Sequence, residues 1–173
     1  MAHHDQTTLT TLRSITPEDQ DFLRRVYAST RADEMAMAPW SEEEKEEFLR
    51  FQFDAQHKYY QEQFPRAAFD LVLLDGEPIG RLYVDRREDE IRLIDIALLP
   101  EHRGCGLGGA IMEEILAEGA AAGKLVRIHV EHNNPAMRLY LRLGFRKIEE
   151  QGIYHLMEWT PPENPEESHN RAG

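Results

Sequence analysis

The chain has little of what marks secreted, membrane or nucleic-acid-binding proteins. Only one of its 173 residues is a cysteine, Cys105, so no disulfide can form within the chain and a reducing compartment is expected. It has no run of about 18 apolar residues, which argues against a transmembrane helix, and its start lacks the charged-then-apolar order of a secretory signal. The formal net charge is −12 and no basic stripe is present, which disfavours nucleic-acid binding. These absences predict a cytoplasmic globular protein.

The sequence predicts one domain over residues 8–160. Its first half is expected to form a strand, two helices and three further strands. Thr16-Pro17-Glu18-Asp19 is typical of a helix start, and the capping box Ser41-Glu42-Glu43-Glu44 opens a second helix that must end before Pro65. Alternating apolar residues and the turn Asp75-Gly76 then predict an antiparallel meander. The strands expected in this half cover residues 9–15, 69–74, 79–85 and 91–99.

The second half alternates strands with helices. A buried stripe from Leu107 to Leu116 predicts a helix that Gly123 ends, and a helical crossover of this kind implies a strand at 125–130 parallel to 91–99. A short helix at 134–143 and strands at 145–148 and 153–159 complete the order β-α-α-β-β-β-α-β-α-β-β. We therefore expect an α/β fold with a mixed, mostly antiparallel central sheet and one splayed parallel strand pair. Residues 161–173, rich in proline and glutamate, are expected to form an acidic, flexible tail.

A glycine-rich segment lies between the strand at 91–99 and the following helix. Four of the six residues from Gly104 to Gly109 are glycines, and such a turn exposes backbone N–H groups at a helix N-terminus, where they bind phosphate. Gly104, Gly106 and Gly109 also match the dinucleotide pattern G-x-G-x-x-G, with Glu131 at the end of the next strand. That alternative fails because the motif follows an antiparallel meander and only 42 residues come after Glu131. A Walker A loop fails because no Gly-Lys-Ser/Thr ends the run.

Two motifs on these elements resemble the GNAT superfamily of N-acyltransferases. They are Arg103-x-x-Gly106-x-Gly108, similar to that family's coenzyme A loop, and Asn133-x-x-Ala136-x-x-x-Tyr140-x-x-x-Gly144-Phe145, similar to its second signature. The order of the elements also matches, so the resemblance covers roughly residues 8–160. The segment from Arg31-Ala32-Asp33-Glu34 to Trp40, with Gln52 and Gln56, suggests a subfamily without an assigned substrate.

The resemblance implies an acetyl-CoA-dependent acyltransferase that needs no metal. The acceptor would be a small-molecule or peptide amine, the protein would bind neither nucleic acid nor membrane, and its oligomeric state is open, with a homodimer as one option. The pantetheine arm would pair with the strand backbone near Leu98 and Leu99, and a backbone N–H near Leu98 would stabilise the oxyanion. The residues expected at the donor are Leu98, Leu99, Arg103, Gly104, Cys105, Gly106, Leu107, Gly108, Gly109, Asn133, Ala136 and Tyr140.

Transfer to an amine requires a base, because an alkylammonium group has a pKa of about 10.4 in water and must lose its proton before it attacks. Asp95 is the first candidate, since it interrupts the apolar strand Ile94–Ile96; a structural ion pair with an arginine such as Arg92 is the equal alternative. Glu131 and His129 lie on the polar face of the strand at 125–130 and are the other candidates.

The departing thiolate needs a proton, and Tyr140 stands where the family commonly places that acid; a core aromatic is the alternative. Cys105 has no evident base partner and is not expected to act as a nucleophile. Residues on the first two helices and their loop, on the meander and on the strand at 125–130 are candidates for acceptor contacts: Trp40, Gln52, Gln56, Tyr59, Tyr83 and His129. The competing hypotheses are a catalytically silent acyl-CoA sensor or partner-binding module on the same fold, a longer acyl donor, and an O-nucleophile.

Overall fold

The computed structural model describes residues 10–163 and divides into two compact units. The first unit runs to Asp85 and takes in Ile94–Gly108, and the second comprises Arg86–Leu93 and the chain from Gly109 onward. The predicted tail from Pro161 and the start of the first predicted strand at Leu9 lie largely outside the described residues. None of the described helices is long and apolar enough to span a membrane.

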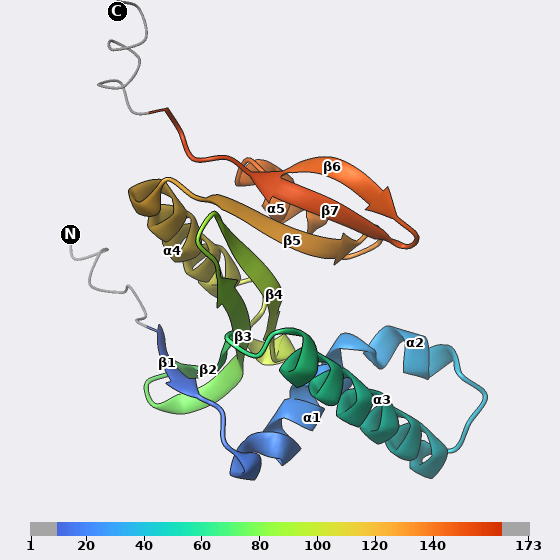
Figure 1. Ribbon diagram of the computed structural model, residues 1–173. Coiled ribbons are helices and arrows are strands. Elements are labelled where there is room, and N and C mark those ends of the chain that lie inside the picture. Colours follow the sequence, from blue (N-terminus) through green and yellow to red (C-terminus); the bar gives the residue numbers. More distant parts are fainter. Residues whose placement is uncertain (1–9, 164–173) are drawn as a thin grey trace, which may run out of the picture. The chain divides into compact units, whose positions relative to one another are not determined.

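Seven strands form the hydrogen-bonded sheet order β1-β2-β3-β4-β5-β7-β6 (Figure 1). Their bounds are β1 Thr10–Ser14, β2 Ala68–Leu74, β3 Glu77–Arg86, β4 Glu90–Leu98, β5 Leu125–Glu131, β6 Arg146–Gln151 and β7 Tyr154–Trp159. The parallel β4–β5 pairing runs from Glu90–Leu125 to Leu93–Ile128, whereas β1–β2, β2–β3, β5–β7 and β6–β7 pair antiparallel. This confirms the predicted mixed, mostly antiparallel α/β sheet with one parallel pair.

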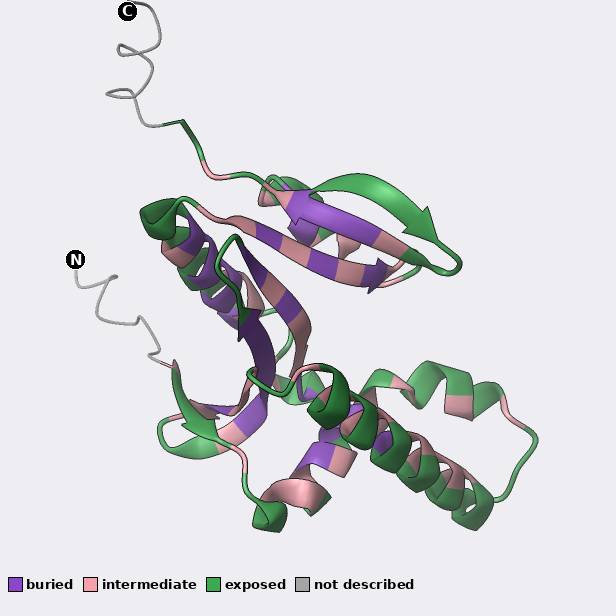
Figure 2. Ribbon diagram, viewed as in Figure 1, coloured by how far each residue is buried: buried purple, intermediate pink, exposed green. Residues whose placement is uncertain are grey.

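The helices of the first unit pack a small apolar core. They are α1 Gln20–Thr30, α2 Ala32–Met37 and α3 Glu42–Gln63, with the 3₁₀ turns Pro17–Asp19 and Pro100–His102. Leu23 and Tyr27 of α1 meet Phe53 of α3 and Leu71 of β2 in a buried cluster, visible as purple segments in Figure 2. Ser41 is the N-cap of α3, where its Oγ accepts from the Glu44 N–H, so the N-cap half of the predicted capping box is confirmed. The sequence prediction missed α2, and none of its residues is buried to give it an apolar period.

The second unit combines β5, β6 and β7 with most of α4 (Leu107–Ala122) and with α5 (Met137–Arg142). Along β5 the side chains of Val126, Ile128 and Val130 are buried, while Arg127 and His129 are half-exposed. This is the alternation of a strand with one core face, as predicted. Gly123, at φ +66°, follows α4 where the sequence predicted its end.

Gly80 allows β3 and β4 to approach closely beside the end of β4. A Cβ atom at this position would overlap the backbone oxygen of Ala97 and come within 2.7 Å of the Leu98 side chain. Leu99 N–H donates to the Ile79 carbonyl at 2.8 Å, so the same contact holds the chain after β4. The missing side chain at Gly80 is therefore a packing requirement of the first unit.

We expect Gly80→Ala to lower the free energy of unfolding by about 1–3 kcal/mol, the usual range for overpacking. Denaturant unfolding followed by circular dichroism measures this. Gly108→Ala is the control, because a Cβ there would lie 4.0 Å from Leu98 Cδ1 and an alanine favours the helix. Equal stabilities for Gly80→Ala and the wild type would contradict the packing argument.

Candidate active site

The glycine loop has a backbone that its glycines make accessible. Gly104 and Gly106 adopt φ of +74° and +87°, in the left-handed region, and a Cβ at either position would have no heavy atom within 4 Å. Backbone conformation and not crowding is therefore the reason for glycine here. The loop from Arg103 to Gly106 is exposed and leads into α4, and Cys105 Sγ contacts the His102 carbonyl at 3.1 Å.

Arg103 anchors the start of this loop. Its Nε donates to the carbonyl of Leu98 at 2.8 Å, and its Nη2 donates to Ser29 Oγ of α1 at 3.0 Å. A second contact between the same segments joins Arg25 to Glu101 at 3.1 Å. Arg103, which is expected to contact the acyl donor, thus fixes the glycine loop to β4 and α1 of the first unit. The sequence analysis did not identify Ser29.

The backbone at the end of β4 offers one N–H for an added extended segment. The Leu99 N–H is used by Ile79, and successive N–H groups of a strand alternate in direction, so the Leu98 N–H is directed away from β3. Of the two positions expected to hold the pantetheine arm, Leu98 is the one whose N–H suits pairing on that side. Both leucine side chains are buried.

Asp95 is ion-paired with a buried arginine of the neighbouring strand. Arg81 on β3 is only 2% exposed, and its Nη2 donates both to Asp95 Oδ2 and, at 3.0 Å, to Gln56 Oε1 of α3. Burial acts to lower the pKa of Arg81, but the charge of Asp95 and the nearby tyrosines outweigh it and raise that pKa. The arginine partner suggested from sequence, Arg92, is not the one observed.

The residues proposed for acceptor contacts divide into interior and surface positions. Gln52 Oε1 accepts from the Tyr27 hydroxyl at 3.1 Å, and Gln56 is held by Arg81. Tyr83 is 1% exposed, with its ring 4.9 Å from that of Phe69 and 6.1 Å from that of Tyr60 on α3, and its contact with an acceptor stays a prediction. Burial raises the pKa of Tyr83 against the opposing effect of Arg81. Tyr59 and Trp40 are exposed.

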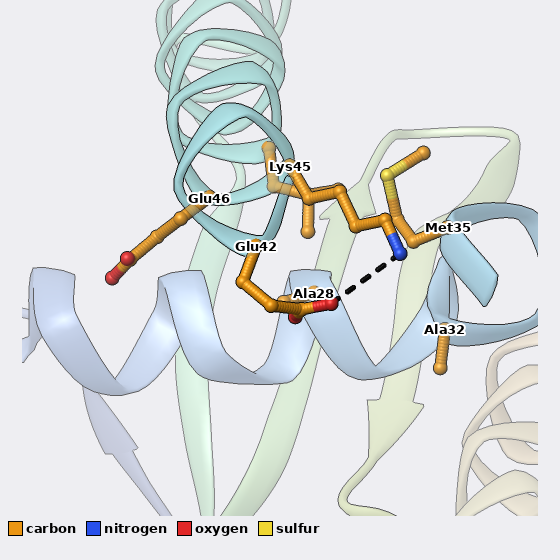
Figure 3. A pocket seen from close by; sticks show the side chains of 7 residues that line it. Ala28, Ala32, Met35, Glu42, Lys45 and Glu46 are labelled. Carbon is orange, nitrogen blue, oxygen red and sulfur yellow. Dashed lines mark hydrogen bonds and ion pairs between the residues drawn. The ribbon is translucent and has the colours of Figure 1, made fainter. Parts of the chain in front are cut away.

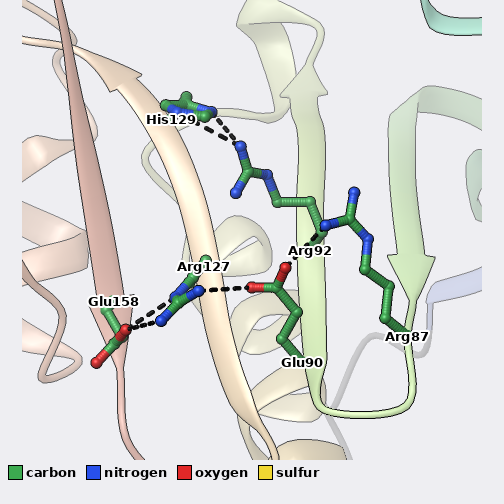
Figure 4. A network of polar contacts seen from close by, with 6 residues as sticks. All are labelled: Arg87, Glu90, Arg92, Arg127, His129 and Glu158. Atoms are coloured by element: carbon green, nitrogen blue, oxygen red, sulfur yellow. Dashed lines mark hydrogen bonds and ion pairs between the residues drawn. The ribbon is translucent and has the colours of Figure 1, made fainter. Parts of the chain in front are cut away.

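In the second unit, His129 belongs to a polar network along β5 (Figure 4). Arg92 Nη2 contacts His129 Nδ1, and His129 Nε2 lies 2.9 Å from Gln151 Oε1. A guanidinium can only donate, so Nδ1 is the acceptor and Nε2 carries the proton toward Gln151. Burial, followed by the charge of Arg92, lowers the pKa of His129. With both ring nitrogens engaged, His129 is poorly suited to accept a proton from an amine.

Arg127 is a second arginine of this network, beside Arg92 and Arg87. It donates through Nε to Glu158 at 2.8 Å and through Nη1 to Glu90 at 3.4 Å, while Arg87 reaches the same Glu90 at 2.8 Å (Figure 4). The hydrogen bond that Arg127 donates to Glu158 raises the pKa of Arg127. The polar face of β5 is therefore largely a structural ion-pair cluster.

The second motif surrounds α5. Tyr140 is 4% exposed, and its ring packs edge-on against Phe145 at 5.8 Å. The Ala136 N–H donates to Asn134 Oδ1 at 2.8 Å, which forms the turn before the helix. Asn133 is exposed, and Glu131 is half-exposed at the end of β5. These positions share the second unit with His129, whereas Asp95, Leu98 and the loop to Gly108 belong to the first.

A hollow of about 300 Å³ lies in the first unit among α1, α2 and α3 (Figure 3). It is lined by Ala28, Ala32, Met35, Glu42, Lys45, Glu46 and Leu49. Lys45 Nζ and Glu42 Oε1 are 3.5 Å apart at its rim, so its polar groups are largely satisfied by one another. None of the predicted site residues lines it.

Two histidines should make stability depend on pH below neutrality. Burial is the main cause that lowers the pKa of both His57 and His129, so the unfolded chain binds more protons than the folded one as the pH falls below about 6.5. We expect the free energy of unfolding to fall between pH 7 and pH 5. In His57→Gln/His129→Gln the slope of this fall should be smaller, measured by urea unfolding at each pH. An identical slope in both proteins would contradict the assignment.

The model of the Acetyltransferase (GNAT) family matches residues 23–145. A curated relative, the [ribosomal protein bS18]-alanine N-acetyltransferase of Haemophilus influenzae, is 29% identical over 68 residues, which are 39% of this chain and 47% of the relative. This chain thus matches about half the length of that relative.

Solved structures show the same fold at low sequence identity. The PaiA N-acetyltransferase of Thermoplasma acidophilum, in complex with coenzyme A, aligns with a TM-score of 0.66 and 19% identity over 88% of this chain and 99% of its own. The ribosomal-protein-S18-alanine N-acetyltransferase of Escherichia coli aligns with a TM-score of 0.59 and 19% identity over 91% and 97%. From the family match over most of its length, the chain belongs to the GNAT family of acetyltransferases.

Proposed function

We propose that this protein is an N-acetyltransferase that transfers the acetyl group of acetyl-CoA directly to a primary amine. The observation that carries the proposal is the exposed glycine loop, with Gly104 and Gly106 in left-handed conformations, between β4 and α4 of a GNAT family member. Its N–H groups would hold the pyrophosphate of the donor without help from a basic side chain. The solved relative with bound coenzyme A supports the choice of donor.

The remaining donor contacts follow from the two motifs. In this proposal the pantetheine arm pairs with the backbone at Leu98, and Asn133 and Ala136 contact the same arm. Arg103 acts by holding the loop against Leu98 and Ser29. Cys105, Leu107, Gly108 and Gly109 contribute their backbone to the pyrophosphate site.

The chemistry requires two proton transfers. The neutral amine nitrogen forms a bond to the thioester carbonyl carbon, the carbon–sulfur bond then breaks, and the electron pair leaves on sulfur. Asp95 or Glu131 takes the proton of the amine, directly or through water, and Tyr140 gives its proton to the thiolate. The Leu98 N–H stabilises the oxyanion. Asp95 ranks first because it interrupts an apolar strand and because its carboxylate, although paired with Arg81, remains 20% exposed.

The acceptor is assigned here only as a primary amine. The match to an alanine N-acetyltransferase supports including protein N-termini among the candidates, and the charge of −12 favours cationic acceptors in general. Thioester turnover with a panel of polyamines, amino acids, aminoglycosides and alanine-starting peptides tests the proposal. Absence of turnover with tight coenzyme A binding would favour a silent acyl-CoA-binding module.

Coenzyme A should raise the melting temperature of the protein, because a ligand that binds only the folded state stabilises it. Gly106→Val should abolish this rise, since a β-branched residue is strained at φ +87° and the exposed loop can distort while the fold remains. Circular dichroism of the variant serves as the control for folding. NADH should give no rise, and a rise with NADH but not with coenzyme A would overturn the choice of donor.

Tyr140→Phe should lower kcat by roughly 10²–10⁴-fold, the usual contribution of a positioned general acid. The change removes only a hydroxyl, so the ring contact with Phe145 and the affinity for acetyl-CoA should persist. Single-turnover kinetics establishes that chemistry is the step observed. Phe145→Leu is the matched control, since it alters the same packing without removing a proton donor. If kcat is unchanged in Tyr140→Phe, the residue is part of the core alone.

A further inference from the structure

A second hollow of the first unit is lined by aromatic rings and carboxylates. Trp40, Glu44, Glu47, Phe48 and Phe51 line an open, shallow hollow of about 390 Å³ on the N-terminal half of α3. We refer to these five residues as the aromatic hollow. It shares no residue with the glycine loop, with the Arg81–Asp95 pair or with the hollow of Figure 3.

The four members on α3 form one stripe of the helix. Positions 44, 47, 48 and 51 are spaced i, i+3, i+4 and i+7, which places their side chains on a single face. Trp40 precedes the N-cap and folds back over this face, with its ring centroid 5.0 Å from that of Phe48 and the two planes at 63°. Two carboxylates and three aromatic rings therefore share this face of the helix.

The rings of the aromatic hollow are exposed to a degree that favours a ligand. Phe51 is 74% and Trp40 40% exposed, whereas Phe53, only two residues along the same helix, is 1% exposed in the core. Covering such apolar surface gains about 25 cal/mol per Å². The contrast between Phe51 and Phe53 shows that the aromatic hollow lies on the side of α3 that does not pack into the first unit.

The negative charge around the aromatic hollow favours a positively charged ligand. Residues 42–51 contain five glutamates against Lys45 and Arg50, a formal charge of −5 + 2 = −3. Glu44 is oriented by the Ser41 hydroxyl, which donates to its Oε1 at 3.2 Å. Glu47 forms no ion pair with any residue that the structure describes. The site therefore offers two carboxylates and the exposed rings of Trp40 and Phe51 to a cation.

We propose that the aromatic hollow binds a small alkylammonium ion. A cation over the face of an aromatic ring is attracted by the ring quadrupole, with tryptophan the strongest partner, and quaternary ammonium groups are recognised in this way. A volume of about 390 Å³ is in the range of small-molecule sites and is small for a protein partner. This site would act in addition to the proposed transferase reaction and does not depend on it.

Choline and 3,3-dimethylbutan-1-ol test the proposal, because they have nearly the same shape and differ in charge. Titrations at low ionic strength would be followed in the ¹H–¹⁵N spectrum through the two indole N–H signals, those of Trp40 and Trp159. Trp40→Phe assigns the signals. Choline should shift the Trp40 indole saturably and leave that of Trp159 in place, while the neutral alcohol should bind at least about tenfold more weakly.

Matched variants separate charge from apolar contact. Glu47→Gln keeps the size of the side chain and should weaken choline binding by about threefold or more, and Phe51→Ala should weaken it similarly. Glu46→Gln is the control, because it removes the same charge from α3 at a position that lines the other hollow. Its choline affinity should stay within about twofold of the wild type, as expected for screening of a more distant charge.

Three results would overturn the proposal. Equal binding of the alcohol and choline would make the aromatic hollow an apolar patch without charge selection. A Trp40 shift that depends on protein concentration alone would identify the occupant as a second copy of the chain. Saturable binding of a lysine-rich peptide at the aromatic hollow, with no binding of choline, would assign the surface to a protein partner. None of these results bears on acetyl transfer, which is measured separately.

Discussion

The guanidinium of Arg81 is a full positive charge among buried side chains, and the first unit is arranged to satisfy it. An unpaired charge in such a position would cost several kcal/mol. Asp95 of β4 and Gln56 of α3 provide the acceptors, and the Tyr83 ring lies 5.1 Å from the cation. One side chain therefore ties β3, β4 and α3 together. Replacing either acceptor would leave the charge partly unsatisfied.

The Arg81–Asp95 ion pair also helps to position the glycine loop, because Asp95 is on the strand that leads to it. Asp95 fixes β4 three residues before Leu98, Gly80 lets β3 lie close against that point, and Arg103 then returns to the Leu98 carbonyl and to Ser29. The Arg103 N–H donates to the Pro100 carbonyl at 3.2 Å, whereas the side-chain contacts that hold the loop do not use the N–H groups of Gly104 or Gly106. In the proposed function these N–H groups bind the pyrophosphate.

The sequence predicted features set by local chemistry and missed those set by long-range pairing. The N-cap at Ser41, the end of α4 at Gly123 and the alternation along β5 depend on neighbouring residues and are confirmed. The partner of Asp95 lies 14 positions away in sequence, and no local pattern distinguishes Arg81 from Arg92. Tyr83 alternates like a half-exposed residue, but β3 is a central strand covered on both faces. The exposed helix α2 has no apolar period to reveal it.

Positive and negative side chains differ in how far they are paired in this protein. The arginines in its interior contacts are neutralised by carboxylates, as with Arg81 and Asp95 in the first unit and with Arg127, Glu90 and Glu158 in the second. The glutamates along the outer side of α3 are only partly paired, so much of the net charge of −12 remains on the surface. Such a surface raises the local concentration of ammonium ions. The same surface would repel the anionic acetyl-CoA of the proposed reaction, so the proposed donor site has to supply a local attraction, which backbone N–H groups at a helix N-terminus can provide.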